Sequence, residues 1–416
     1  MKNLCIVILS GIVVFLSITI LYHNRKELLE YIEGLGNIST AGARDRAAFK
    51  ADKKGKGDIR IGFVYSFGNA QASLRDGVRL ACMEINRKGI LNGRKIELIE
   101  KDNSGSAEGC KKVIQELVDD RGVVVIIGGV NYMNFLSAAP LCEFNGIVFI
   151  SPTLTSGIVS EMEFFRMAFI NFPSIRQVIK TMYRALDENN LKRSYIISPS
   201  EFCAGYYFAN AFDSFMPRNP TGETGIIYRQ ILYPQSPPEL IEDSLELFES
   251  FGKFDSLLIC GSIELVKETV GYVAKLKNKP VCFLSGEMEN PEIAGFPECK
   301  KLRVFLPSTY DPGVNKKALL DFQKSYEKEF QKAPDVWAAQ GYDTLNVLAF
   351  AIAEAKSSRP SSIVDALLKV KYENNVTVAP FISFNNYGEL SSGRVIMKSL
   401  ENGVFKVVPG SGKKEK

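Results

Sequence analysis

The feature that most constrains the fold is an alternation of strand-like and helix-like segments that runs through the chain twice. Short apolar runs rich in branched residues, such as 59–65 and 123–127, alternate with segments whose apolar residues recur at helical spacing, such as 74–88. The uninterrupted apolar character of residues 123–127 is typical of a strand covered on both faces. Alternation of this kind predicts an α/β fold with mostly parallel sheets.

Two rounds of the alternation predict two doubly wound, Rossmann-like lobes. Strands are expected at residues 59–65, 96–102, 123–127, 147–150, 195–198, 225–232, 256–260 and 281–284. Helices are expected at residues 74–88, 107–119, 134–145, 175–189, 205–215, 240–251 and 263–277. Three more helices are expected at residues 316–329, 336–355 and 361–370, followed by apolar segments at 381–384 and 394–399.

An uncharged run of 19 residues, 4–22, lies near the start of the sequence. It is long enough to span the hydrocarbon layer as one helix, and no small-residue cleavage site follows it closely. We therefore predict a signal anchor with a transmembrane helix over residues 1–22, and whether this segment is cleaved stays open. Residues 23–57 become polar and rich in Gly and Lys, which predicts a linker to a periplasmic or extracellular body tethered to the cell membrane.

The histidine and cysteine content excludes several classes of enzyme and metal site. The one histidine, His23, lies beside the N-terminal apolar run, so the rest of the chain cannot support Ser-His-Asp or Cys-His catalysis or His-ligated zinc. None of the eight cysteines forms a CxxC pair, and no nucleotide-binding glycine motif surrounds Gly128 and Gly129. We expect no enzyme activity, no cofactor and no metal site. Cysteines in apolar runs, such as Cys260, are interpreted as small buried residues, with disulfides left open.

The charge distribution argues against a nucleic-acid partner. The formal net charge is +4, and the basic excess lies in Lys2, residues 23–57 and the tail 410–416, so the body is close to neutral. A nucleic-acid-binding protein carries its basic surface on the folded part.

The predicted strand ends indicate where a ligand would bind. In open α/β sheets, ligands lie beyond the carboxyl ends of the strands, where loops and helix N-termini present unpaired N–H groups. This rule points to four loops, at residues 66–73, 128–134, 151–157 and 285–290. With two lobes, we expect the site to lie between them.

Two of these loops carry groups suited to a zwitterion. The hydroxyl-rich loop 151–157 can donate hydrogen bonds to a carboxylate, although the same residues suit turns and helix caps. Glu287 follows the apolar strand 281–284, where a carboxylate is costly unless it meets a cation such as a ligand ammonium. The other interpretation of Glu287 is an exposed loop acid. Tyr132 can line a pocket, whereas Trp337 is expected to pack in a core.

Longer motifs in a characteristic order indicate a family. They are IRIGFVYSFG, DGVRLACMEINRKGILNGRKIELIEKDN, VVVIIGGV, IVFISPTLTS, AAQGYDTLNVLAFAIAEA and FNNYGELSSGRVIMKSLENGVFKVV. Through their order and spacing, residues 58–409 resemble the type I periplasmic-binding-protein fold, specifically the branched-chain amino-acid-binding proteins that serve ABC transporters. The resemblance implies two lobes joined by a three-segment hinge, with crossings near residues 173, 309 and 379. The implied division is 58–172 and 309–378 for lobe 1, 173–308 and 379–409 for lobe 2, and 410–416 for a basic tail.

The resemblance also implies how the ligand is held. The α-carboxylate is expected between the loop at Asn131 and Tyr132 and the loop 151–155, and Glu287 matches the acid that holds the α-ammonium. Within the second of these loops, the hydroxyl of Thr155 and the backbone groups of Thr153 and Leu154 are the implied donors. The expected ligand-binding residues are Asn131, Tyr132, Ser151, Thr153, Leu154, Thr155, Cys203, Ser262 and Glu287.

Some positions depart from the family pattern. Cys203 stands where a ligand-contacting tyrosine is common, although Tyr206 and Tyr207 are close in sequence. The first loop has Ala70 and Gln71 where an aromatic residue commonly closes over the ligand.

The expected function is that of an extracytoplasmic solute-binding protein. It would close two lobes around an amino acid or a close relative and present it to an ABC permease. The alternative is a ligand-sensing ectodomain that acts through a separate signalling partner.

Overall fold

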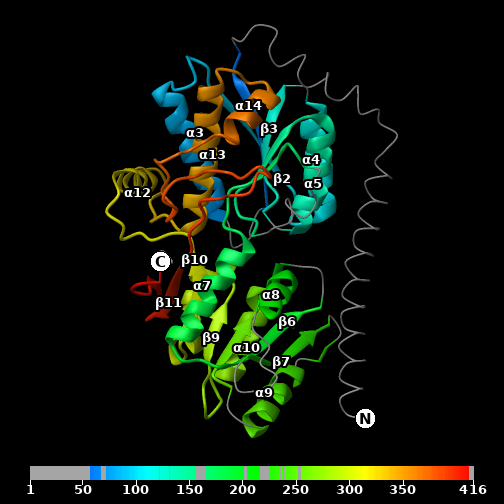
Figure 1. Ribbon diagram of the computed structural model, residues 1–416, viewed down its shortest axis with the longest axis vertical. Coiled ribbons are helices and arrows are strands. Elements are labelled where there is room, and N and C mark those ends of the chain that lie inside the picture. The colour runs from blue at the N-terminus through cyan, green and yellow to red at the C-terminus, as the bar shows by residue number, and fades with distance from the viewer. Residues whose placement is uncertain are drawn as a thin grey trace.

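The computed structural model describes most of the chain after residue 56 (Figure 1). The described residues are 57–66, 72–120, 122–130, 132–155, 165–200, 204–215, 225–233, 236–237, 239–251 and 254–411, without the side chains of 204, 215, 225–228 and 247–251. The predicted anchor, nearly all of the predicted linker, Asn131 and Cys203 lie outside them. Within this part of the chain, no helix has the length and apolarity that crossing a membrane requires.

The first sheet has five parallel strands in the order β2-β1-β3-β4-β5. The strands are β1 (Ile59–Tyr65), β2 (Ile96–Asp102), β3 (Val123–Ile127), β4 (Val148–Ser151) and β5 (Ala168–Ile170). One face is covered by α4 (Ala107–Asp119) and α5 (Tyr132–Asn145), and the other by α3 (Ala72–Lys88), α13 (Val336–Ala355) and α14 (Pro360–Leu367) (Figure 1). The helix α12 (Lys317–Phe330) packs beside α3. Every residue of β3 is buried, as expected for a strand with helices on both faces.

The second sheet has seven strands in the order β12-β11-β10-β9-β8-β6-β7. Its parallel strands are β6 (Arg193–Pro199), β7 (Gly225–Leu232), β8 (Ser256–Ile259), β9 (Val281–Leu284) and β10 (Val304–Ser308). The antiparallel pair β11 (Ile396–Glu401) and β12 (Val404–Val407) extends it beyond β10. The covering helices are α7 (Ile175–Glu188) and α8 (Ala204–Phe215) on one face, and α9 (Glu239–Phe251), α10 (Ile263–Val273) and α11 (Pro291–Gly295) on the other. Two short 3₁₀ turns, η1 (Gly286–Met288) and η2 (Pro297–Lys301), flank α11.

The observed elements confirm the predicted strand–helix alternation in both lobes, with a few differences. The sequence pattern does not predict β5, β10 or β12. In β10 the reason is Pro307, since a proline within a run argues against a strand that needs its backbone donors. The apolar segment 381–384 forms no strand, because only isolated bridges pair Ile382 with Tyr372 and Phe384 with Leu390.

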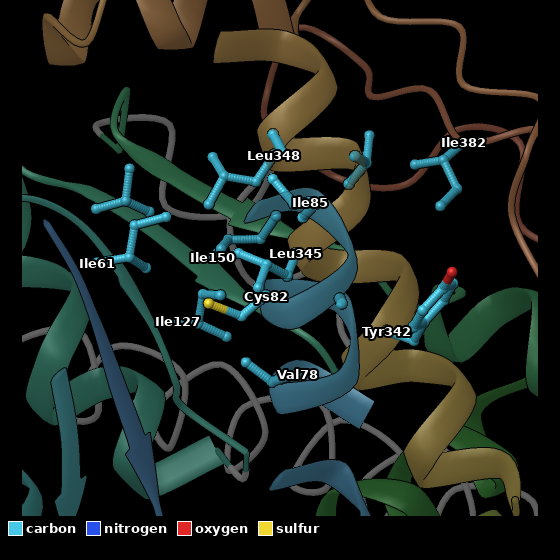
Figure 2. Close-up of a cluster of buried hydrophobic side chains, with 14 of the residues drawn as sticks. Ile61, Val78, Cys82, Ile85, Ile127, Ile150, Tyr342, Leu345, Leu348 and Ile382 are labelled. Atoms are coloured by element: carbon cyan, nitrogen blue, oxygen red, sulfur yellow. The ribbon is translucent and has the colours of Figure 1, made fainter. Parts of the chain in front are cut away.

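The core on one face of the first sheet, called the first core below, contains a close crossing of α3 and α13. The two helices lie side by side in Figure 2. A Cβ atom on Gly77 would lie 2.0 Å from the carbonyl oxygen of Ala338, and one on Gly341 would lie 2.4 Å from the carbonyl oxygen of Leu74. The two glycines therefore let the helix backbones approach each other directly. Around this crossing, apolar side chains such as Val78 and Leu345 fill the space above the sheet (Figure 2).

The cysteines and the tryptophan of the described residues behave as core residues. The six described cysteines are buried, and Trp337 is 3% exposed. Both observations confirm the interpretation made from the sequence.

One face of α13 carries buried polar side chains that bind segments near the lobe connections. Gln340, Asp343 and Thr344 share this face, because residues three and four apart are neighbours on a helix. Gln340 Nε2 donates to Thr309 Oγ1 over 2.8 Å, and Asn171 Nδ2 donates to Thr344 Oγ1 over 3.0 Å. The Asp343 carboxylate accepts three hydrogen bonds from the segment 376–377, from two backbone N–H groups and one hydroxyl, over 2.8–3.0 Å. This polar face of α13 thus anchors three segments of the chain.

The third crossing of the chain between the lobes, predicted near residue 379, stays a prediction. The packing of the residues around it favours a crossing later in the sequence. Leu390 packs in the core between the first sheet and α13, and its N–H donates to the Ile170 carbonyl over 3.1 Å. Val395 packs in the core between the second sheet and α7. We propose that the chain crosses between residues 390 and 395 rather than near residue 379.

Titration of Asp343 is expected to make stability depend on pH. Burial raises the pKa of Asp343 from 3.8 to about 6, so the folded protein binds this proton more tightly than the unfolded chain. Lowering the pH from 7 to 4 should therefore add stability through this group, on the order of 3 kcal/mol in full. Asp343→Asn cannot take up the proton. In urea denaturation, the difference in unfolding free energy between wild type and Asp343→Asn should rise as the pH falls, and a pH-independent difference would contradict this expectation.

Candidate ligand-binding site

The carboxyl edges of the two sheets face each other, and two tyrosines mark where they meet. Tyr132 begins α5 after β3, and Tyr207 lies in α8 after β6. Their ring centroids are 4.0 Å apart, with an angle of 32° between the ring planes. Since β1–β5 run parallel in the first sheet and β6–β10 in the second, this contact brings the loops after β3 and β4 in the first lobe toward the loops after β6, β8 and β9 in the second.

Two hydroxyl groups of the first lobe join its site loops to each other. Ser151 Oγ donates to the Gly129 carbonyl over 2.8 Å and accepts from the Leu154 N–H over 3.3 Å. Thr153 Oγ1 donates to the Val130 carbonyl over 3.0 Å. Both hydroxyl protons are therefore donated within the protein. The side chain of Leu154 packs in the core beneath the loop, and whether these three residues bind a ligand stays a prediction.

Gly129 permits this arrangement of the loops. Its φ of 67° lies in the left-handed region, and a Cβ there would lie 2.8 Å from the Phe149 ring. No nucleotide-binding motif surrounds this glycine pair in the sequence, and Gly129 serves a close backbone approach.

Thr155 differs from Ser151 and Thr153. Its side chain is half-buried, and among the described residues it makes no hydrogen bond. The hydroxyl that the family resemblance implies as a ligand donor is therefore the one that the loop leaves available. Tyr132 is also half-buried at the same edge.

Ser262 acts as a helix cap. Its Oγ accepts from the Leu265 N–H over 3.3 Å at the start of α10, and the residue is exposed. The start of α8 is close to this loop, since a Cβ on Gly205 would lie 2.7 Å from the backbone nitrogen of Gly261. Ser262 is thus at the expected edge of the second sheet, with its side chain engaged in capping.

Glu287 lies in η1, directly after the carboxyl end of β9. Its side chain is half-buried, and Ser285 Oγ donates to its Oε1 over 3.2 Å. Burial raises the pKa of Glu287, and the hydrogen bond from Ser285 opposes that rise. No Lys or Arg of the described residues forms an ion pair with it. The result is a half-buried carboxylate beyond the carboxyl end of β9, with no ion pair to a described cation.

Some residues at this edge were not identified from the sequence. The contact of Tyr207 with Tyr132 spans the two lobes, and the sequence offered only the closeness of Tyr207 to position 203 as a signal. The ion pair between Glu289 and Lys398 is almost fully buried next to η1. In the sequence, the one feature that could have indicated this pair is Lys398, which follows two apolar residues at the start of β11.

Comparisons with known proteins agree with this architecture. Residues 58–202 match a protein family described as periplasmic binding protein, and no curated protein matches. A substrate-binding protein of an ABC transporter from Desulfitobacterium hafniense, in complex with Leu, is 22% identical, with a TM-score of 0.72 over 84% of this chain and 100% of that chain. The branched-chain amino acid transporter substrate-binding protein of Streptococcus pneumoniae, in complex with isoleucine, is 19% identical, with a TM-score of 0.71 over 84% and 99% of the two chains. A solute-binding protein from R. palustris, in complex with benzoate, is 16% identical, with a TM-score of 0.70 over 86% and 97% of the two chains.

The family match and the structural neighbours agree with the topology of the two sheets. Substrate-binding proteins of ABC transporters, including those for branched-chain amino acids, share this architecture over most of the chain. The resemblance seen in the sequence is therefore confirmed: the chain matches the periplasmic binding protein family over residues 58–202 and has the type I periplasmic-binding-protein fold.

Proposed function

We propose that this protein binds an amino acid or a close relative between its two lobes. The observation that carries the proposal is Glu287, a half-buried carboxylate at the carboxyl edge of the second sheet, with no ion pair to a described cation. A carboxylate removed from water is costly unless a positive charge compensates it. The ammonium group of an amino acid would supply that charge.

The two lobes would hold opposite ends of the ligand. Thr155 would donate its free hydroxyl to the ligand carboxylate, on a loop kept in place by the hydrogen bonds of Ser151 and Thr153. Hinge closure would then bring Glu287 to the ammonium group. Because closure expels water, both charge interactions become stronger in the closed form.

Glu287 favours a zwitterion over a simple acid. The structurally similar proteins described above bind leucine, isoleucine or benzoate, so the fold alone does not select a ligand class. An acid without an ammonium group would place a second negative charge in a site that already contains an uncompensated carboxylate. We therefore expect amino acids to bind better than aromatic or aliphatic acids.

A ligand screen tests the proposal directly. A thermal-shift screen of the twenty L-amino acids should raise the melting temperature for at least one of them, because a ligand of the native state stabilises it. Titration calorimetry with that amino acid, its amide and its des-amino analogue should then give at least tenfold weaker binding for both analogues. Equal or tighter binding of the des-amino acid or of benzoate would contradict the proposal.

Thr155→Val is expected to weaken binding of the amino acid by about tenfold to a hundredfold, because a hydrogen bond to a charged carboxylate is lost. Binding of the corresponding amide should change much less. The matched control is Thr181→Val on α7, where the hydroxyl donates within its own helix to the Gln177 carbonyl over 3.0 Å. Equal losses for the acid and the amide in calorimetry would contradict the carboxylate assignment.

Delivery to an ABC permease and tethering by residues 1–22 complete the proposal. Support comes from the ABC-transporter context of the structurally similar proteins and from the uncharged run 4–22 in the sequence. With a permease reconstituted in vesicles, the ligand-loaded protein should accelerate ATP hydrolysis and uptake. Ligand-dependent output through a separate signalling protein, without uptake, would favour the sensing alternative instead.

A further inference from the structure

We propose that the buried ion pair between Glu289 and Lys398 positions the turn that carries Glu287 and is therefore required for recognition of the ligand ammonium. This inference rests on the proposed role of Glu287, and it adds two residues that do not touch the ligand. The pair acts through the turn, so both members are positioning residues.

The turn η1 carries two acidic side chains that differ in burial. Glu287 is half-buried, whereas Met288 and Glu289 are 4% and 7% exposed. Glu287 lies within η1 and Glu289 is the residue that ends it, and the two side chains have different environments. Holding the Glu289 side chain in the interior consequently restrains the end of the turn that carries Glu287.

Lys398 connects this turn to the neighbouring strands. It lies on β11 opposite Leu306 of β10, is 2% exposed, and forms an ion pair through Nζ with Glu289 Oε1. The same Nζ lies 5.6 Å from the ring centroid of Tyr310, which belongs to the first core and follows β10 at a lobe crossing. One ammonium group thus contacts both the turn that carries Glu287 and a residue of the lobe connection.

The turn also depends on close backbone packing. A Cβ on Gly286 would lie 2.8 Å from the Pro307 carbonyl oxygen, and the Glu289 N–H donates to the Gly286 carbonyl over 3.1 Å. The backbone of η1 therefore rests on β10, and the Glu289 side chain reaches across to Lys398 on β11.

Loss of Lys398 would leave Glu289 as a buried charge without compensation. Burial already raises the pKa of Glu289, and Lys398 opposes that rise, while Asp335 at the start of α13 adds to it. A buried ion pair that loses one partner is strongly destabilised, because the remaining charge must be protonated or reach water. Either change moves the turn, and a binding group must stay within about 0.5 Å of its productive position to keep its interaction.

The experiment compares Lys398→Met, Glu289→Gln and the double variant by titration calorimetry. The probes are the tightest-binding member of the twenty L-amino acids and its des-amino analogue. Each single variant should bind the amino acid at least tenfold more weakly and the des-amino analogue within twofold of wild type. The double variant should recover part of the lost affinity, since it contains no buried charge at this place. Thermal melting of each variant verifies the fold, and if Lys398→Met does not fold, Glu289→Gln and the double variant decide the outcome.

Lys406→Met is the matched control. Lys406 forms a 3.2 Å ion pair with Glu401 on the same β11–β12 hairpin, but both side chains are more than half exposed. Its loss should change the affinity for both probes by less than twofold.

The possible outcomes separate this inference from the function on which it rests. Equal losses for both probes would mean that the pair only stabilises the fold, and would overturn the inference. Normal amino-acid binding by Lys398→Met, together with weak binding by Glu287→Gln, would overturn the inference and keep the proposed function. Normal binding by Glu287→Gln, or no amino-acid binding by the wild type, would overturn both.

Discussion

Glu287→Gln should reduce the affinity for an amino acid by about a hundredfold or more, because the ligand ammonium loses its negatively charged partner in a desolvated site. Gln has nearly the same size and still accepts the hydrogen bond from Ser285, so the turn should keep its shape. Titration calorimetry of the wild type and the variant measures the loss, and a thermal melt of each verifies that the fold is intact.

The matched control for Glu287→Gln is Glu298→Gln. Glu298 is also a half-buried acid of the second lobe, but it lies in η2, which leads into β10 and is therefore at the opposite edge of the sheet. Its replacement should leave the affinity within twofold of wild type. Equal affinities of Glu287→Gln and the wild type would contradict the assignment of the ammonium site.

The pH dependence of binding gives a second test of Glu287. Its pKa is raised by burial in the unliganded protein, and the ligand ammonium favours the ionised carboxylate, so binding should lower that pKa and release a proton. The affinity should consequently fall as the pH is lowered through the raised pKa. Binding enthalpies in two buffers of different ionisation enthalpy should differ in the same pH range. An affinity that stays constant from pH 7 down to pH 4.5 would contradict this coupling.

Gly77→Ala and Gly341→Ala should each destabilise the protein by about 3 kcal/mol or more. In both cases the new methyl group meets a backbone carbonyl oxygen of the partner helix at 2.0–2.4 Å, and a backbone atom cannot rotate away as a flexible side chain can. The helices α3 and α13 would have to separate, which opens the first core around them. Urea denaturation measures the loss as a change in unfolding free energy.

Gly271→Ala on α10 is the control for the glycine variants. It is also a helical glycine, but a Cβ there has no neighbour within 4 Å. The same substitution should stabilise α10 by up to about 1 kcal/mol, because alanine has the higher helix propensity. Because both core glycines serve one crossing, the double variant should lose less than the sum of the two single losses. Unchanged stability of Gly341→Ala would contradict the close approach of the helices.

The fold could be predicted because its main signal is local. Apolar runs such as 123–127 and helical spacing such as 74–88 determine strand and helix from a few neighbouring residues. The pattern is less informative where distant contacts decide the conformation. β10 contains Pro307 and was not predicted, yet it pairs with β9 and β11.

The sequence predicts which loops follow the carboxyl ends of the strands, including the turn that contains Glu287, but not the partners of individual hydroxyl groups. The place of Glu287 follows from its position after a strand. Ser151 and Ser262 have the same chemistry in the sequence as a ligand donor, and only their three-dimensional neighbours reveal that they serve a loop connection and a helix cap. Glu289 and Lys398 are 109 residues apart, so no local pattern could pair them.

The polar face of α13 has a consequence for the timing of ligand release. Since Gln340, Asp343 and Thr344 hold three separate segments against α13, we expect these segments to move together with that helix when the lobes open. Dissociation of the ligand would then require one whole lobe to move through the solvent. We expect its residence time to lengthen as the viscosity of the medium increases.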